Sequence, residues 1–361
     1  MSQLIDRFHK MESKNNLFDL GSEINLPIWD IIRYHVYIKY YYSKKDRETL
    51  SIPIKHLKKD YLRIAKHFFV FWFSLFFRKR DNIVFTYSRY VNNKGQYFDK
   101  SALPIIETLV DNCLKVEALV GKKTAYNYIY DFSSLLTRVY PKKKVSIEYY
   151  MKINDALRAA CGENRFTYEE LNNIYTSYKS QYTFYNFFLS IKKPKNVIIC
   201  TGNPKALILA AKRSKVKTFI VQHGGIERDE IDYSYPADIT LKSKILFPET
   251  LLTFGSYWGQ NINIPAKNII PIGNDFFYSK PKVTCDNSIL IVSTIIHGGE
   301  LKVITKKMAE LRPDLNFIFK LHPNEFHFKS KYISYFKNNL NVTIITIEEE
   351  TNKLISKSKV L

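Results

Sequence analysis

Short, nearly continuous apolar runs recur along most of the chain after its first 80 residues. Runs of this length are typical of parallel strands, because such strands are covered on both faces of the sheet. Longer segments with helical spacing separate several of the runs, for example at 168–191 and 204–214. This alternation of strand and helix favours an α/β fold. The first series of predicted strands covers 82–88, 115–120, 196–202, 217–224, 250–255 and 268–273.

A polar break at 278–287 separates this series from a second one. The second series alternates strands and helices in the same way, and the chain then ends on Val360 and Leu361, which have the character of a further strand start. We therefore predict two doubly wound units, over 81–280 and 288–361, preceded by a helical, aromatic and basic segment over 1–80. In the second unit the predicted strands are 288–294, 315–323 and 341–347, and the predicted helices are 298–311, 326–339 and 348–359.

Charge narrows the choice of partners. The chain has 55 Lys+Arg against 34 Asp+Glu, a formal net charge of +21. An excess of this size favours a nucleic acid, an anionic membrane surface or a phosphorylated substrate. The positive charge is spread along the chain, and no helix-turn-helix, zinc or RNP-like motif accompanies it, so a nucleic-acid-binding protein is the weaker alternative.

The cysteines and the first residues of the chain bear on the compartment. The four cysteines lie far apart and none belongs to a C-x-x-C pair. This spacing argues against a zinc site and against a disulfide framework. The segment MSQLIDRFHK at the start contains no apolar signal-peptide core. We therefore expect a cytoplasmic protein without a bound metal.

One aromatic run, FFVFWFSLFF at 68–77, has two interpretations. A membrane-spanning helix needs about 20 apolar residues, and this run is much shorter. It is either a buried helix or an interfacial segment whose basic neighbours contact anionic headgroups. In the second case the protein would lie peripherally on the inner face of the cytoplasmic membrane. The basic neighbours are Lys66, Arg78, Lys79 and Arg80.

Two histidines follow predicted strands directly. Ligands of open α/β sheets bind beyond the carboxyl ends of the strands, so His223 and His322 are candidate site residues. Gln222 and the two glycines Gly224 and Gly225 flank the first of them, and glycine lets a backbone turn sharply or approach a ligand closely. His223 would act as a general base or as a donor to a phosphate, and Gln222 would orient a sugar or a base.

Further candidates lie at other strand ends. Gly298 and Gly299 open a predicted helix after Ser293 and Thr294, and backbone N–H groups at a helix start favour phosphate oxygens. Lys320 adds a cation beside the second histidine. The remaining candidates are Asp99, a loop carboxylate and possible base after the first strand, and three cleft-lining residues at strand ends, Gly255, Gly273 and Asn274.

The order of these segments resembles one group of enzymes. QHG at 222–224, TFGSYWG at 253–259, IGN at 272–274, ILIVST at 289–294 and KLHPNE at 320–325 look like bacterial surface-polysaccharide glycosyltransferases of the GT-B architecture. That group includes capsule and O-antigen enzymes, and it is related to the bacterial sialyltransferases and the CDP-glycerol glycerophosphotransferases of teichoic-acid synthesis. The N-terminal NLPIWDIIRYHVY at 25–37 resembles the opening of such proteins, so the similarity covers about 20–347.

The resemblance implies two Rossmann-like domains facing a cleft, with the acceptor in the first and a nucleotide-activated sugar in the second. It implies no cofactor and no metal, and a lipid-linked or glycan acceptor. By the same resemblance His322 contacts the donor phosphate and His223 takes part in catalysis. A CDP-polyol phosphotransferase remains the nearest alternative, because the motifs do not show which bond of the donor breaks.

The resemblance also raises an expectation about the second unit. Relatives continue past its third strand with a further strand and a helix bearing a glutamate that helps to hold the nucleotide. This chain ends at Leu361. We therefore expect an incomplete C-terminal sheet of three or four strands, an open flank at 341–347 and weak or absent donor binding. An inactive remnant is accordingly a third possibility.

Overall fold

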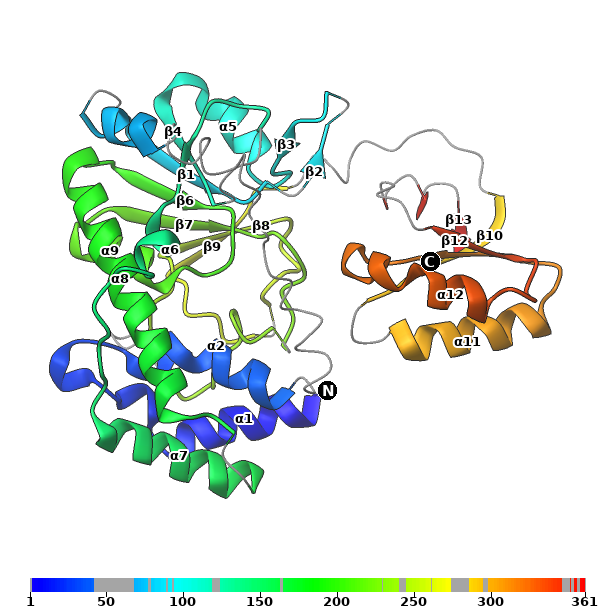
Figure 1. The fold of residues 1–361 in the computed structure, drawn as a ribbon, viewed down its shortest axis with the longest axis horizontal. Helices are drawn as coiled ribbons and strands as arrows, with labels where there is room; N and C mark the ends of the chain where they lie inside the picture. The colour runs from blue at the N-terminus through cyan, green and yellow to red at the C-terminus, as the bar shows by residue number, and fades with distance from the viewer. Residues whose placement is uncertain are drawn as a thin grey trace. The chain divides into compact units, whose positions relative to one another are not determined.

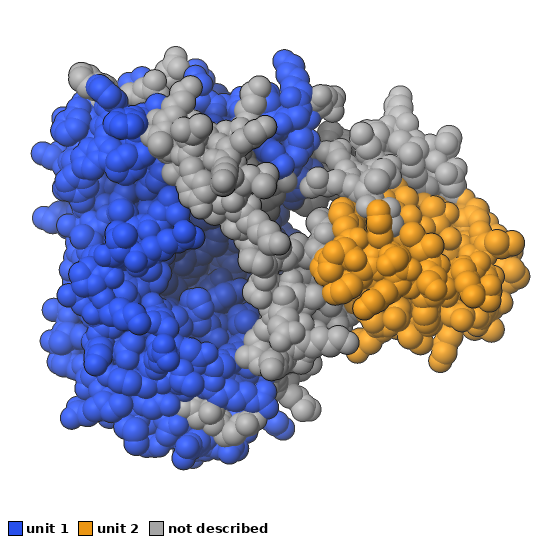
Figure 2. Space-filling model, in the orientation of Figure 1, with its two compact units in different colours: residues 1–41, 55–274 blue, residues 42–54, 275–361 orange. Residues whose placement is uncertain are grey.

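The structure of this protein is a computed structural model, and its described residues fall into two compact units. Of these residues, 2–41 and those between 68 and 273 belong to unit 1, and those between 286 and 360 belong to unit 2 (Figure 2). The described residues are 2–41, 68–76, 79–88, 90–92, 94–118, 124–162, 165–228, 230–239, 245–260, 262–273, 286–294, 298–345, 351, 354–355 and 358–360.

Unit 1 contains a parallel sheet whose seven described strands run in the order β5-β4-β1-β6-β7-β8-β9. When these seven strands are numbered by their order along the chain, they lie across the sheet as third, second, first, fourth, fifth, sixth and seventh. The direction of winding therefore reverses between β1 and β6, which makes this the switch point of the sheet. The strands are β1 (Asn82–Thr86), β4 (Cys113–Glu117), β5 (Ile129–Tyr130), β6 (Asn196–Ile199), β7 (Lys217–Val221), β8 (Thr250–Thr253) and β9 (Asn268–Pro271).

A short antiparallel hairpin and several helices complete unit 1. The hairpin pairs β2 (Tyr90–Val91) with β3 (Tyr97–Phe98). A further helix at 68–76, called the aromatic helix below, precedes β1. The other helices are α1 (Ser2–Lys14), α2 (Ile28–Tyr41), α5 (Leu103–Leu109), α6 (Ser133–Leu136), α7 (Ile147–Cys161), α8 (Tyr168–Lys192) and α9 (Lys205–Arg213), with 3-10 turns η1 (Leu17–Asp19), η2 (Ser22–Ile24) and η3 (Val110–Asn112).

The long helix α8 has clear start and stop signals. Its N-cap is Thr167, whose hydroxyl accepts from the N–H of Glu170 while the Glu170 carboxylate accepts from the N–H of Thr167, a reciprocal capping box. Lys193 ends the helix in the left-handed conformation. Figure 1 shows α1, α2 and α7 grouped beside α8.

The N-terminal helices share the core of the sheet. One cluster of buried apolar side chains includes Ile5 of α1 and Trp29 of α2 together with Val116 of β4 and Phe188 of α8. The apolar face of a helix is stabilised by burial against another element. Residues 2–41 of the predicted helical segment are therefore part of unit 1.

Unit 2 repeats the strand order of unit 1 on a smaller scale. Its described strands form a parallel sheet in the order β12-β11-β10-β13. The helices α11 and α12 cover it, and the 3-10 segment η4 follows β11. The elements are β10 (Asp286–Val292), α11 (Gly298–Leu311), β11 (Asn316–Lys320), η4 (Pro323–Phe328), α12 (Lys329–Tyr335), β12 (Val342–Ile345) and β13 (Ser358–Val360).

The predicted α/β fold with two doubly wound parallel sheets is confirmed, as is the strand start near Val360. The expected sheet of three or four strands with an open flank at its third strand also agrees with the described residues, because β12 is an edge strand of a four-stranded sheet. The next strand along the chain, β13, lies beside β10, on the opposite side of the sheet. The reason is the switch point. After the third strand the chain returns across the sheet and adds the fourth strand next to the first.

Candidate functional site

The loop after β7 carries the first predicted histidine and is fixed by a buried glutamine. Gln222 is 0% exposed, and its Nε2 donates to the carbonyl of Gly224 at 2.8 Å. Its Oε1 accepts from the N–H of Phe254 at 2.7 Å, which ties the exit of β7 to the exit of β8. Both halves of the amide are used within the protein, so this geometry favours a bracing role for Gln222 over the predicted contact with a ligand. His223 itself is exposed.

The two glycines after His223 leave open space in front of the backbone. Neither Gly224 nor Gly225 has a left-handed φ, so a tight turn does not explain them. A Cβ atom added at Gly224 would meet nothing within 4 Å, and one at Gly225 would meet only the Glu227 side chain at 4.0 Å. The open space fits the other predicted reason for glycine at these two positions, which is the close approach of a ligand to the main chain.

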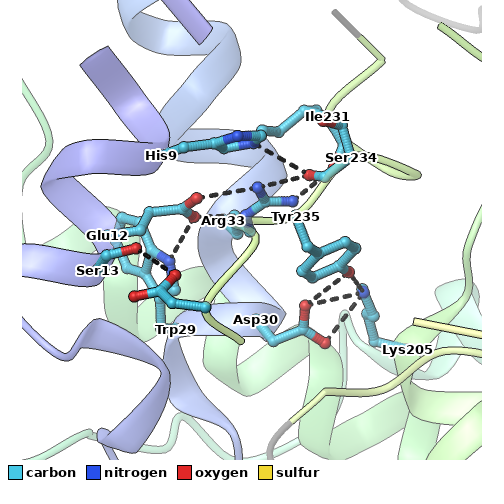
Figure 3. A network of polar contacts seen from close by, with 11 residues as sticks. His9, Glu12, Ser13, Trp29, Asp30, Arg33, Lys205, Ile231, Ser234 and Tyr235 are labelled. Atoms are coloured by element: carbon cyan, nitrogen blue, oxygen red, sulfur yellow. Dashed lines mark hydrogen bonds and ion pairs between the residues drawn. The ribbon is translucent and has the colours of Figure 1, made fainter. Parts of the chain in front are cut away.

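The N-terminal helices hold the chain that continues from this loop (Figure 3). Arg33 of α2 is 2% exposed and donates to the carbonyl oxygens of Ile231 and Ser234. Its charge is compensated by Glu12 of α1, which is 0% exposed and also accepts from Trp29. Burying two charges is costly unless they are paired and hydrogen-bonded, and this pair is both.

A second ion pair, with a buried carboxylate, lies beside the first (Figure 3). Asp30 is 1% exposed and pairs with Lys205, the first residue of α9, at 3.0 Å. Asp30 also accepts from the Tyr235 hydroxyl and from the N–H of Leu246. The two ion pairs thus connect α1, α2 and α9 to both ends of the segment that follows His223.

The other predicted residues of unit 1 have different surroundings. Asp99 is 5% exposed and accepts from the N–H groups of Tyr87, Ser101 and Ala102 at 2.9 to 3.2 Å. A carboxylate whose oxygens already accept from three main-chain N–H groups favours a structural role over that of a base. Gly255 is half-buried, and Gly273 has a φ of +79°, which explains glycine there. Asn274 lies outside the described residues.

A polar cluster at the carboxyl ends of β1 and β4 was missed by the sequence analysis. Glu117 is 0% exposed and accepts from the hydroxyls of Thr86 and Ser88. The Ser88 hydroxyl also lies 3.0 Å from that of Tyr126, whose pKa is raised to about 12 by burial. Across the switch point, the side-chain amide of Asn203 is buried without a hydrogen-bond partner. One sequence signal could have revealed this cluster, because polar residues stand at the ends of two adjacent strands.

In unit 2, the loop after β11 is organised by a buried glutamate. Glu325 is 4% exposed, accepts from the N–H of His322 at 3.1 Å and accepts from the Tyr332 hydroxyl at 2.6 Å. His322 is half-buried, and burial lowers its pKa; Glu325 opposes this shift and Lys320 adds to it. Lys320 is 5% exposed at the end of β11. The lowered pKa favours the neutral imidazole, which can donate through one ring nitrogen.

Of the predicted phosphate-binding residues before and at the start of α11, some are buried and others are exposed. A Cβ atom at Gly298 would lie 2.2 Å from Glu325 Oε1, 2.6 Å from the Tyr332 hydroxyl and 2.7 Å from Ser293 Oγ, so any larger residue requires these side chains to shift. Gly298 and Ser293 are buried, whereas Thr294 and Gly299 are exposed. The Glu325 carboxylate already lies close to the start of α11, where a negative charge is stabilising. Thr294, Gly299 and His322 are the predicted residues left accessible to an incoming phosphate.

The two histidines lie in different units, and their placement on one cleft stays a prediction. Among the described residues, no group of three or more His, Cys, Asp or Glu side chains is arranged to hold a metal ion. Within the same residues, no helix combines the length and the apolar character needed to cross a membrane.

Comparison with known proteins gives matches to solved structures only. No protein-family model matches the chain, and no curated protein matches it. The UDP-GlcNAc 2-epimerase from Methanocaldococcus jannaschii matches at 15% identity and a TM-score of 0.39, over 76% of this chain and 75% of that chain. The UDP-GlcNAc 2-epimerase from Neisseria meningitidis, bound to UDP-GlcNAc, matches at 13% identity and a TM-score of 0.40, over 77% of this chain and 76% of that chain. MurG from Acinetobacter baumannii matches at 9% identity and a TM-score of 0.37, over 77% of this chain and 70% of that chain.

Proposed function

We propose that this chain is a glycosyltransferase that moves a sugar from a nucleotide-activated donor to a lipid-linked acceptor in the synthesis of a bacterial surface polysaccharide. The observation that carries the proposal is the position of His223. It is exposed at the carboxyl end of a parallel strand, on a loop braced by buried Gln222 and bordered by open main chain at Gly224. Ligands of open α/β sheets bind at this edge.

The proposed reaction is a displacement at the anomeric carbon of the donor sugar. The acceptor hydroxyl oxygen forms the new bond to that carbon, and the bond from the carbon to the diphosphate oxygen breaks. The electron pair leaves with the nucleoside diphosphate. The hydroxyl proton passes to His223, which acts as general base.

Unit 2 supports the donor side of this proposal. As a glycosyl bond breaks, negative charge grows on the leaving phosphate, and preorganised donors lower the barrier. His322 would donate one ring N–H to a phosphate oxygen, with its main chain fixed by Glu325. The exposed turn at Thr294 and Gly299 leaves room for the phosphate beside it.

The test separates binding from turnover in the 361-residue chain. Saturation-transfer NMR with a panel of UDP-, GDP-, CMP- and CDP-linked sugars detects even weak donor binding. Transfer of radiolabel from a bound donor to a bacterial lipid extract measures turnover. We expect His322→Ala to weaken binding and His223→Ala to lower turnover by about 10²- to 10³-fold with binding retained. His327→Ala, another histidine of unit 2 and exposed, is the matched control.

Each outcome has a defined meaning. If no nucleotide sugar shows saturation transfer, the proposal fails. If CDP-glycerol is consumed and its phosphate is found on the acceptor with release of CMP, the enzyme is a polyol phosphotransferase. Equal, small effects of both histidine substitutions would contradict the assigned roles while leaving the reaction class open.

A further inference from the structure

The aromatic helix at 68–76 has one buried face and one exposed face. On the buried face, Phe71 is 4% exposed and Leu75 is 0% exposed. On the other face, Phe69, Phe73 and Phe76 are 65%, 67% and 63% exposed. Their spacing of four and three residues places the three rings in one row along the helix. A buried helix and an interfacial segment were the two predicted alternatives, and the burial pattern favours the second.

The helix is docked firmly, so the exposed row has a fixed orientation. The Phe71 ring stacks on Phe184 and Phe188 of α8, with centroid separations of 5.5 and 5.9 Å. The buried Lys192 of α8 donates to the main-chain carbonyl of Ser74 in the last turn of the aromatic helix. A cation at this end complements the helix dipole. The apolar row is thus presented by a packed element of unit 1.

Beyond the end of this helix lies a basic hollow. It has a volume of ≈ 550 Å³. Three of its cations, Lys79, Arg80 and Lys193, are exposed. Its one carboxylate, that of Asp81, is paired with Lys195 at 2.9 Å. The residues that line the hollow are Lys79, Arg80, Asp81, Asn112, Lys192 and Lys193.

We propose that the exposed phenylalanine row and the neighbouring cations of unit 1 together dock the protein on the anionic surface of a lipid bilayer. Phe69, Phe73 and Phe76 would enter the interface between headgroups and acyl chains, and the three exposed cations would contact lipid phosphates. Aromatic rings beside cations are the combination that binds such a surface. A second copy of this chain is a poorer occupant, because self-association would bring the two sets of like charges together. The inference does not depend on which reaction the protein catalyses.

Vesicle flotation of the full chain tests the proposal. The vesicles contain either phosphatidylcholine alone or phosphatidylcholine mixed with about 30% of the anionic lipid phosphatidylglycerol. We expect flotation only with the anionic vesicles and its loss at high salt. Lys79→Gln, Arg80→Gln and Lys193→Gln together should weaken binding by about fivefold per cation. The matched control removes the same number of positive charges from unit 2, through Lys307→Gln, Lys329→Gln and Lys331→Gln. This variant should bind the vesicles like the unchanged protein.

A second variant tests the apolar row. Phe69→Ser, Phe73→Ser and Phe76→Ser remove exposed rings only, so we expect the folded protein to keep its thermal stability and lose at least tenfold in binding. Leu311→Ser, a change of an apolar side chain that is 78% exposed in unit 2, is the control. Binding that is equal for neutral and anionic vesicles, or unaltered in either triple variant, overturns the proposal. A lipid-free dimer that becomes a monomer in the phenylalanine variant also overturns it, since a second copy would then cover the row.

Discussion

In unit 1 the strands run β5-β4-β1-β6 from one edge, and in unit 2 they run β12-β11-β10-β13, so each sheet places its first strand beside its fourth. The two units differ in what fixes the loops at the carboxyl ends of the strands. In unit 1, ion pairs buried between α1, α2 and α9 hold the chain after His223. In unit 2, the loop after β11 is held by Glu325, Tyr332 and close packing at Gly298.

The difference shows that one strand order can be stabilised in two ways. A large unit can bury charges, because helices from distant parts of the chain surround them. A small unit buries a smaller share of its surface. In unit 2 the buried Glu325 carboxylate is held by one main-chain N–H and one hydroxyl. The exposed ion pairs, Arg312–Asp314 in unit 2 and Asp81–Lys195 in unit 1, add little to stability.

The largest expected effect comes from breaking the buried pair of unit 1. Arg33→Met leaves the buried Glu12 carboxylate with the Trp29 indole as its donor, and we expect a loss of about 3–5 kcal/mol in the free energy of unfolding. Urea denaturation followed by circular dichroism measures it.

Two further variants complete this experiment. Arg312→Met in unit 2 is the matched control and should leave the urea midpoint unchanged. Adding Glu12→Gln to Arg33→Met should recover part of the loss, because it removes the unpaired charge. A loss below about 1 kcal/mol in Arg33→Met would mean that the pair does not anchor unit 1.

The next effect is a pH dependence that arises in the same region. Burial and the neighbouring Arg33 lower the pKa of His9 to about 4, and neutral His9 contacts the Ser234 carbonyl. The unfolded chain takes up this proton at about pH 6.5. Because the folded pKa is depressed, the contribution of His9 is present above pH 6.5 and is lost as the pH falls toward 4. The loss should reach up to about 3 kcal/mol.

The measurement is the difference in unfolding free energy between the unchanged protein and His9→Gln, taken from pH 7.5 to pH 4. Glutamine retains a donor for the Ser234 carbonyl and cannot take up a proton. We expect the unchanged protein to lose stability relative to the variant over this range. A flat difference would show that His9 carries the same charge in both states.

The third prediction concerns the packing of unit 2. Gly298→Ala places a Cβ within 2.7 Å of three polar oxygen atoms, so we expect a loss of about 1–3 kcal/mol in the unfolding free energy. Gly299→Ala meets nothing within 4 Å and should be neutral or slightly stabilising in the first turn of α11. Thermal unfolding of the pair measures both. Equal melting temperatures would show that the contacts at Gly298 relax without cost.

The smallest effect is expected at the start of α8. Thr167→Ala removes both hydrogen bonds of its hydroxyl in the capping box and should lower stability by about 1 kcal/mol. Thr167→Ser keeps the hydroxyl and serves as the control. In unit 2, the N-cap of α12 makes no side-chain hydrogen bond, so no equivalent loss exists there. If serine and alanine prove equally damaging, the methyl group and not the hydroxyl is responsible.

Much of the fold could be predicted because apolar runs reveal buried strands directly. The runs at 82–88 and 217–224 contain β1 and β7, and both histidines were placed correctly beyond strand ends. The strand β5 was missed, since two residues are too short to give a periodic signal. The position of β13 followed from the topology of the sheet and not from its own residues.

The site was harder to predict because its roles depend on partners distant in sequence. Gln222, Asp99 and Gly298 stand in segments typical of ligand binding, but each is occupied by contacts within the protein. Likewise, a charged Arg33 on a helix reads as a solvated residue until its partners 198 and 201 positions away are known.

Those sequence separations have a consequence for biosynthesis. The carbonyl groups that Arg33 contacts belong to residues 231 and 234, and Asp30 needs the N–H of Leu246. At a translation rate of about 5–20 residues per second, the ribosome takes roughly 10–40 seconds to reach them after α2 has been made. During that interval Arg33 lacks the two carbonyl oxygens that it contacts in the folded unit. Closure of unit 1 is thus a late event, because a nascent chain paused before residue 246 also lacks the N–H group that Asp30 contacts.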